Sequence, residues 1–133
     1  MIVLDASAVL ELLLATPAGG RVAERVADPG ESLHSPHLLA VEVAQVLRRY
    51  VRTGAVDGTR AEGALVDLDE LDVARYDHEP LLPRMWELRA NLTAYDASYV
   101  ALAEVLTAPL LTLDERLAAA PGHRATIELV PRR

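Results

Sequence analysis

The stretch Ile2-Val3-Leu4-Asp5-Ala6-Ser7 decides the fold that we expect for this chain. A short, continuous apolar run such as its first three residues is typical of a strand that is buried on both faces of a parallel sheet. An acidic residue follows the run directly, and the apolar residues over 8–14 have the spacing of a helix. The chain therefore opens with a strand, a carboxylate at the end of that strand, and a helix.

The same alternation continues along the rest of the sequence. We expect further strands over 32–34, 72–76, 110–113 and 126–130, and further helices over 19–27, 36–53, 59–70, 80–91, 95–106 and 115–120. Ser35 and Pro36 predict the start of the 36–53 helix, as N-cap and first helical residue, and Gly54 predicts its end. Strands separated by helices predict an α/β domain with a mostly parallel central sheet of about four to five strands and helices on both faces.

Composition limits both the organisation and the chemistry of the chain. Its 133 residues contain no visible linker or repeat, and one domain per roughly 100–200 residues is the usual expectation. All 13 basic residues are Arg and Cys is absent, which excludes lysine-dependent phosphate loops, Schiff bases, thiol nucleophiles and cysteine-bound zinc. We see neither a signal peptide nor a membrane span, and we expect a cytoplasmic protein with no membrane partner.

Four of the 20 acidic residues stand in structured places. Asp5 and Asp114 each follow a predicted strand, and ligands of parallel sheets bind at the carboxyl ends of the strands. Glu42 lies at the edge of the apolar stripe of the 36–53 helix, and Asp96 leads the apolar stripe of the 95–106 helix. A structural role is open for each, because Asp5 and Asp114 would serve as N-caps, Asp96 as a first-turn charge, and Glu42 as the partner of an Arg.

Carboxylates that share one crevice repel each other, and their pKa values rise unless a cation lies among them. Ligation by oxygen alone suits Mg²⁺ or Mn²⁺. No zinc spacing is visible among the four histidines, which are His34, His37, His78 and His123.

Four segments of the chain resemble the acidic motifs of the PIN domain, in the order and at the spacings usual for that family. They are 3–8, 36–49, 92–104 and 111–117, and together they span nearly the whole sequence. The stretch Thr93-Ala94-Tyr95-Asp96-Ala97 and the compact length look most like the VapC toxins of bacterial and archaeal toxin–antitoxin pairs.

The resemblance implies a single PIN domain over residues 1–133, folded as a three-layer sandwich, with the activity of a Mg²⁺- or Mn²⁺-dependent endoribonuclease. The motif acids that correspond to its catalytic, metal-binding quartet are Asp5, Glu42, Asp96 and Asp114. Ser7 and Thr112 match positions that assist the quartet by hydrogen bonding. Many members carry a further acid after the fourth motif; Glu115 is a near candidate but is expected to turn away from the crevice, so the resemblance leaves open whether one or two metal ions bind. In this family the metal ions activate a water molecule and neutralise charge on the phosphate.

The RNA substrate has to be held by arginine, which suits forked contacts with phosphate. Arg49 lies beside Glu42 on the predicted helix, with Arg48 and Arg52 further round the same side. Arg89 and Arg116 lie near two of the acidic motifs and are further candidates for substrate binding. A merely solvated helix face is the alternative for these arginines.

The resemblance also implies a homodimer that pairs with a cognate VapB-like antitoxin, whose basic side chain would enter the acidic crevice. The segment 10–14 is more apolar than a one-sided helix requires, which fits an antitoxin groove, a dimer contact or ordinary core. Two other functions stay open, an RNA-processing PIN nuclease without a toxin role and a catalytically inactive PIN-fold binding module. A receiver domain or an aspartate-nucleophile phosphatase is disfavoured because both typically need a lysine.

Overall fold

A computed structural model describes all residues from 1 to 133 and contains a central sheet of five parallel strands. The strands are β1 (Ile2–Leu4), β2 (Leu33–Pro36), β3 (Val73–Tyr76), β4 (Leu110–Thr112) and β5 (Ile127–Leu129). Their order across the sheet is β3-β2-β1-β4-β5, so the opening strand is central and both of its neighbours pair with it in parallel. Because every pair is parallel, the carboxyl ends of all five strands lie at one edge, as the sequence predicts.

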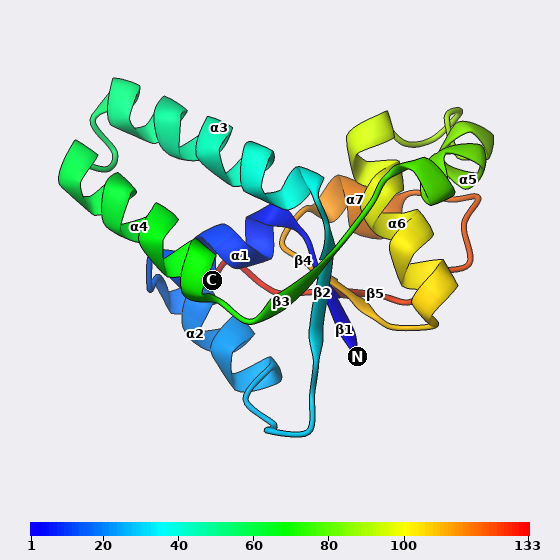
Figure 1. Ribbon diagram of the computed structural model, residues 1–133, viewed down its shortest axis with the longest axis horizontal. Helices are drawn as coiled ribbons and strands as arrows, with labels where there is room; N and C mark the ends of the chain where they lie inside the picture. The colour runs from blue at the N-terminus through cyan, green and yellow to red at the C-terminus, as the bar shows by residue number, and fades with distance from the viewer.

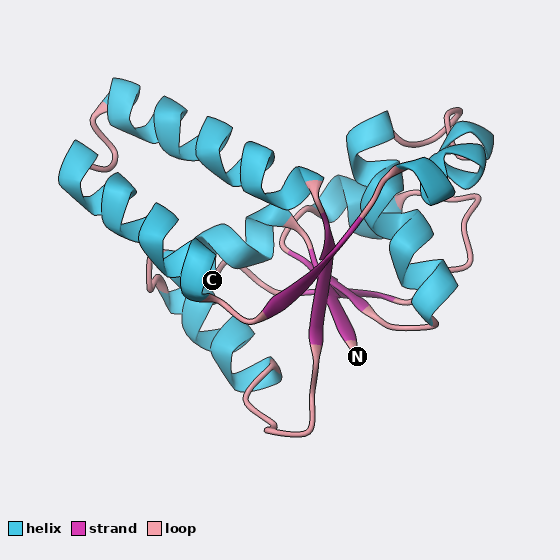
Figure 2. Ribbon diagram, viewed as in Figure 1, coloured by secondary structure: helices cyan, strands magenta, loops and turns pink.

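Helices cover both faces of this sheet (Figures 1 and 2). The first group is α1 (Ala6–Leu13), α2 (Pro17–Arg25), α3 (Leu38–Thr53) and α4 (Gly58–Glu70). The second group is α5 (Leu82–Glu87), α6 (Ala94–Leu106) and α7 (Glu115–Ala119), preceded by a 3₁₀ turn over Glu79–Leu81. The expected α/β three-layer sandwich is confirmed. No helix is long and apolar enough to cross a membrane.

Two hydrophobic cores, one on each side of the sheet, hold the layers together. The opening strand contributes to both cores, because Ile2 and Leu4 pack with α1 to α4, whereas Val3 packs with α6 on the opposite face. All three side chains are fully buried. This alternation is the physical reason why a strand in the centre of such a sheet reads as a continuous apolar run.

The start of α3 differs from the prediction. Ser35 and Pro36 belong to β2, where Pro36 pairs with Tyr76 of β3, and the helix begins at Leu38. The buried Ser35 hydroxyl donates to the carbonyl oxygen of Leu4 at 3.0 Å instead of capping the helix. The cap comes from far along the chain, because His78 Nε2 accepts the Leu38 N–H at 2.9 Å. Sheet pairing and a distant imidazole therefore override the local Ser-Pro signal.

The helix predicted over 80–91 is also interrupted, into the 3₁₀ turn and the six-residue α5. Pro83 has no N–H to donate to the carbonyl of Glu79, so an α-helical ladder cannot run through this point. The predicted end of α3 is confirmed: Gly54 follows the helix in the left-handed conformation, with φ of +80°. Glycine adopts this conformation without steric cost.

Candidate active site

The carboxyl edge of the sheet brings the four predicted acids into one region. Asp5 directly follows β1, and Asp114 lies two residues beyond β4, its neighbour in the sheet. Glu42 stands in the second turn of α3, which begins just after β2, and Asp96 is the third residue of α6. Two central strands and two helices, one from each layer, thus converge on the same place.

Asp5 is the buried centre of this region, with only 5% of its surface exposed. Its Oδ1 accepts hydrogen bonds from the Ser7 hydroxyl at 2.6 Å and from the Ala8 N–H at 3.0 Å. Its Oδ2 accepts one bond, from the Thr112 hydroxyl, at 2.5 Å. A carboxylate oxygen has two lone pairs, so Oδ1 is fully used and Oδ2 keeps one lone pair for a further partner. Asp5 is both the N-cap of α1 and a candidate ligand.

The two hydroxyls beside Asp5 link it to the end of β4. Ser7 Oγ accepts the Leu113 N–H at 2.9 Å, and Thr112 Oγ1 accepts the Asp114 N–H at 3.0 Å. Each hydroxyl therefore receives a backbone N–H and turns its own proton towards Asp5. The hydrogen bonding that the sequence analysis expected of Ser7 and Thr112 is thus present in the structure.

Asp114 caps α7, where its Oδ1 accepts the N–H groups of Arg116 at 2.9 Å and Leu117 at 3.3 Å. Glu115 is exposed next to it. Asp96 lies in the first turn of α6, where its backbone N–H donates to the Thr93 hydroxyl at 3.1 Å. The structural roles open to Asp114 and Asp96 are therefore real, and they leave both carboxylates half-buried at the edge of the sheet.

Glu42 has a partner that the sequence analysis did not foresee. The hydroxyl of Tyr99 on α6 donates to Glu42 Oε1 at 2.5 Å, and neither an Arg nor any other basic side chain pairs with this carboxylate. Tyr99 is 1% exposed, so it reaches Glu42 from within the second core. The sequence does contain a signal for this partner, because Tyr99 is the polar side chain in the otherwise aliphatic stripe of α6.

Electrostatics couple the four acids. Burial raises the pKa of Asp5, although the hydroxyls of Ser7 and Thr112 partly oppose this, and the charge of Asp114 raises it further. Burial, Asp114 and Asp5 together raise the pKa of Asp96. The pKa of Glu42 is raised by burial and by Asp96, against the Tyr99 hydrogen bond. Each of these three carboxyls therefore resists ionisation because of burial and because another acid of the group lies near it.

The donor chemistry of the group fits a divalent cation of the Mg²⁺ type. Its ligands would all be oxygens, and no basic side chain neutralises any of the four carboxylates. No three of the acidic or histidine side chains are arranged as a ready-made metal cage. Mg²⁺ does not require such a cage, since it usually keeps several water molecules and binds one or two carboxylates.

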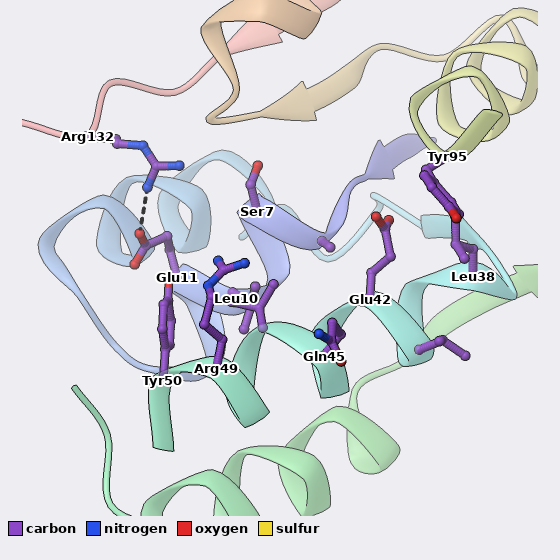
Figure 3. Close-up of a pocket in the computed structure, with 13 residues that line it drawn as sticks. Ser7, Leu10, Glu11, Leu38, Glu42, Gln45, Arg49, Tyr50, Tyr95 and Arg132 are labelled. Carbon is purple, nitrogen blue, oxygen red and sulfur yellow. Dashed lines mark hydrogen bonds and ion pairs between the residues drawn. The ribbon is translucent and has the colours of Figure 1, made fainter. Parts of the chain in front are cut away.

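A groove of about 570 Å³ lies between α1 and α3, with Glu42 in its lining (Figure 3). Ser7 and Glu42 line it together with the half-buried Tyr50, the exposed Tyr95 and Arg49. A second hollow of about 430 Å³ is also lined by Ser7, together with Asp114, Glu115, Arg116 and Arg132. The groove and the second hollow share Ser7 and Arg132, and each is lined by one of the four acids, Glu42 and Asp114 respectively.

The predicted arginines divide between this region and other surfaces. Arg49 and Arg116 line the groove and the second hollow, respectively. Arg48 and Arg52 line a smaller hollow further along α3, which Arg49 shares. Arg89 packs its guanidinium 4.6 Å from the Trp86 ring centroid, so the structure does not bring it into the groove. Arg132, which the sequence analysis did not single out, lines both the groove and the second hollow.

Comparison with known proteins gives a consistent result. The sequence profile of the PIN domain matches residues 2–122. Ribonuclease VapC12 of Mycobacterium tuberculosis is 45% identical over 130 residues, which cover 98% of this chain and 99% of the relative. Ribonuclease VapC9 of the same organism is 47% identical over 135 residues, covering 99% and 100%. The crystal structure of PAE2754 from Pyrobaculum aerophilum has a TM-score of 0.69 at 28% identity, covering 95% of this chain and 81% of that one.

Proposed function

The chain belongs to the PIN-domain family, and from this premise we propose that it is a Mg²⁺- or Mn²⁺-dependent endoribonuclease and the toxin of a type II toxin–antitoxin pair. The observation that carries the proposal is the group of four carboxylates at one sheet edge, none of them paired with a base. The names of the relatives that are 45–47% identical, VapC12 and VapC9, support the ribonuclease reaction.

Asp5 and Asp96 are the direct metal ligands in this proposal, and Glu42 and Asp114 bind directly or through water. Ser7 and Thr112 hold the Asp5 carboxylate by hydrogen bonds, and the remaining lone pair of Oδ2 would be available to a cation. Tyr99 fixes Glu42 from the core side and leaves Glu42 Oε2 without a protein partner. A divalent cation bound there would lower the pKa of a water molecule and neutralise charge on the scissile phosphate.

The proposal is tested by incubating the purified protein with total RNA, with and without Mg²⁺, and mapping the cut sites. We expect cleavage that requires the metal and is abolished by Asp5→Asn or Asp96→Asn. Unchanged cleavage by either variant would contradict the ligand assignment. Failure of the unaltered protein to cut any RNA with Mg²⁺ or Mn²⁺ would favour the inactive binding module instead.

The toxin role adds a cognate antitoxin and a homodimer to the proposal. A basic side chain of the antitoxin, inserted among the four carboxylates, would displace the cation by competing for the same charges. Co-purification of a small neighbouring gene product that suppresses the Mg²⁺-dependent cleavage is the expected result. If the chain cuts RNA but no such neighbouring gene product exists, the protein would be an RNA-processing nuclease without a toxin role. The homodimer is tested separately, by light scattering of the purified protein.

A further inference from the structure

The segment that follows β5 is held by hydrogen bonds next to the end of β4. Val130 is 7% exposed, and its N–H donates to the carbonyl oxygen of Thr112 at 2.8 Å. Arg21 of α2 donates to the carbonyl oxygen of Pro131 from Nε, at 3.0 Å, and from Nη2. One turn further along α2, Arg25 forms a two-pronged ion pair with Glu128, at 2.7 and 2.9 Å. The backbone that leads to Arg132 is therefore held next to the strand that supplies the Thr112 hydroxyl.

The side chain of Arg132 is held as well. Its Nη1 donates to Glu11 Oε1 at 3.0 Å, a contact drawn in Figure 3. Glu11 Oε2 in turn accepts the Thr16 hydroxyl at 2.6 Å, so the carboxylate that receives the arginine is itself fixed. A guanidinium has five N–H donors, and this contact uses one of them. The side chain of Arg132 is 59% exposed, so the other donors face solvent or a ligand.

The position of Arg132 sets it apart from the other arginines. It is the one basic residue that lines both the groove with Arg49 and the hollow with Arg116. The two depressions share Ser7 as well, whose hydroxyl holds the Asp5 carboxylate at 2.6 Å. A phosphate chain that spans the groove and the second hollow would run past Ser7 and Arg132, the two residues that line both.

We propose that Arg132 is a substrate-binding residue that contacts an RNA phosphate next to the one being cleaved. This inference rests on the proposed ribonuclease function. The carboxylates would repel the phosphates that flank the scissile one. A cation bound among those carboxylates would neutralise the charge of the scissile phosphate only. The flanking phosphate needs a separate positive charge at the junction of the two depressions, and a guanidinium supplies it with paired donors.

The test compares Arg132→Gln with Arg133→Gln. Both substitutions remove one positive charge from adjacent positions, but Arg133 is exposed and lines neither depression. Binding of a fluorescent single-stranded RNA oligonucleotide is measured with Mg²⁺ in an Asp5→Asn background, and a gel confirms that the strand stays intact. We expect Arg132→Gln to weaken binding about tenfold, the effect of losing a charge-assisted hydrogen bond. It should also make the slope of log affinity against log salt shallower by about 0.7, whereas Arg133→Gln should do neither.

An Arg132→Lys variant separates charge from geometry. It should keep the salt slope of the parent, because it keeps the charge, but should not recover the full affinity, because it loses the fork. Equal effects of Arg132→Gln and Arg133→Gln would overturn the inference, since the charge alone would then explain them. Thermal unfolding of each variant should match the parent, because the Glu11 pair is largely exposed on the arginine side.

The two proposals fail separately in these experiments. Metal-dependent cleavage by the unaltered protein, combined with equal RNA binding by the two variants, would remove Arg132 and leave the nuclease. Absence of cleavage, combined with selective loss of binding in Arg132→Gln, would remove the nuclease and leave an RNA-binding role for Arg132.

Discussion

Replacement of Tyr99 by Phe removes one hydroxyl and tests whether Glu42 is held as an ionised carboxylate. The hydroxyl donates to Glu42 Oε1 at 2.5 Å, and the ring is 1% exposed, so Phe can fill the same space without opening a cavity. Burial and the neighbouring Glu42 raise the pKa of the Tyr99 phenol, which therefore stays a protonated donor. Loss of a hydrogen bond to a charged acceptor costs about 2 kcal/mol. We expect the free energy of unfolding to fall by about that amount at neutral pH.

The effect of Tyr99→Phe should depend on pH. The pKa of Glu42 in the folded protein is raised above its ordinary value of 4.5. The folded state then binds more protons than the unfolded state in the range just above this value, so the contribution of Glu42 to stability decreases as pH rises through that range. Tyr99 opposes the rise in pKa; without its hydroxyl, the pKa of Glu42 moves further upward. The loss of stability should accordingly be larger at neutral pH than below 4.5, where Glu42 is largely protonated in both states.

Denaturant unfolding in EDTA, near pH 4 and near pH 7, measures both effects. Tyr95→Phe is the matched control, because Tyr95 is 61% exposed and its hydroxyl has no hydrogen-bond partner in the structure. This control should change stability by less than about 0.5 kcal/mol. If Tyr99→Phe cost no more than Tyr95→Phe, or cost the same at both pH values, the charged hydrogen bond to Glu42 would be disproved. In the cleavage assay, the acidic limb of the pH profile should also move to higher pH.

Three further predictions concern the charge of Glu42, the binding of Mg²⁺ and the packing of α1 against α2. Glu42→Gln keeps an oxygen that accepts the Tyr99 hydroxyl and removes a charge beside Asp96. Its free energy of unfolding in EDTA, compared with that of the unaltered protein, should therefore increase as pH rises above 4.5, because only the unaltered protein has to ionise Glu42. Mg²⁺ should raise the unfolding temperature of the unaltered protein, because it binds the folded state. It should not raise that of Asp96→Asn. An equal rise in calorimetric scans of the two proteins at matched pH would contradict Asp96 as a metal ligand. Gly19→Ala would place a Cβ 2.0 Å from the carbonyl oxygen of Glu11 and should destabilise the α1–α2 contact by about 3 kcal/mol or more. Gly20→Ala, one residue on, meets open space and should stabilise by about 0.5–1 kcal/mol; similar urea midpoints for the two variants would show that α1 and α2 do not pack as described.

The parts of the fold that follow from the sequence are those decided by neighbours in the chain. Val3 and Leu4 are buried on opposite faces of the sheet, and the apolar run over 2–4 is enough to predict that strand. Gly54 ends α3 because its own left-handed backbone permits it. The positions of Asp5 and Asp114 at the ends of strands are predictable, because each acid directly or nearly follows its strand in the chain.

The parts that the sequence did not reveal depend on residues far apart in the chain. The N-terminus of α3 is capped by His78, 40 positions beyond Leu38, so the local Ser-Pro signal predicted the wrong start. Glu42 is held by Tyr99, 57 positions away, and Arg132 by Glu11, 121 positions away. No helical or strand periodicity carries information over such separations; these contacts exist only once the sheet has brought the segments together.

The distribution of charge is compatible with the proposed RNA substrate, although the net charge of the chain is −7. Two of the arginine–carboxylate pairs, Arg84–Glu104 and Arg25–Glu128, neutralise each other away from the acidic crevice. The four carboxylates of the crevice have no such partner, and three of them are kept hard to ionise by burial and mutual repulsion. In the proposed nuclease, a bound cation would relieve that repulsion and attract phosphate, so metal binding and RNA binding would support each other at this site. Under the same proposal, the arginines that line the groove and the second hollow, Arg49, Arg116 and Arg132, would position the strand, because the carboxylates themselves offer no attraction to phosphate.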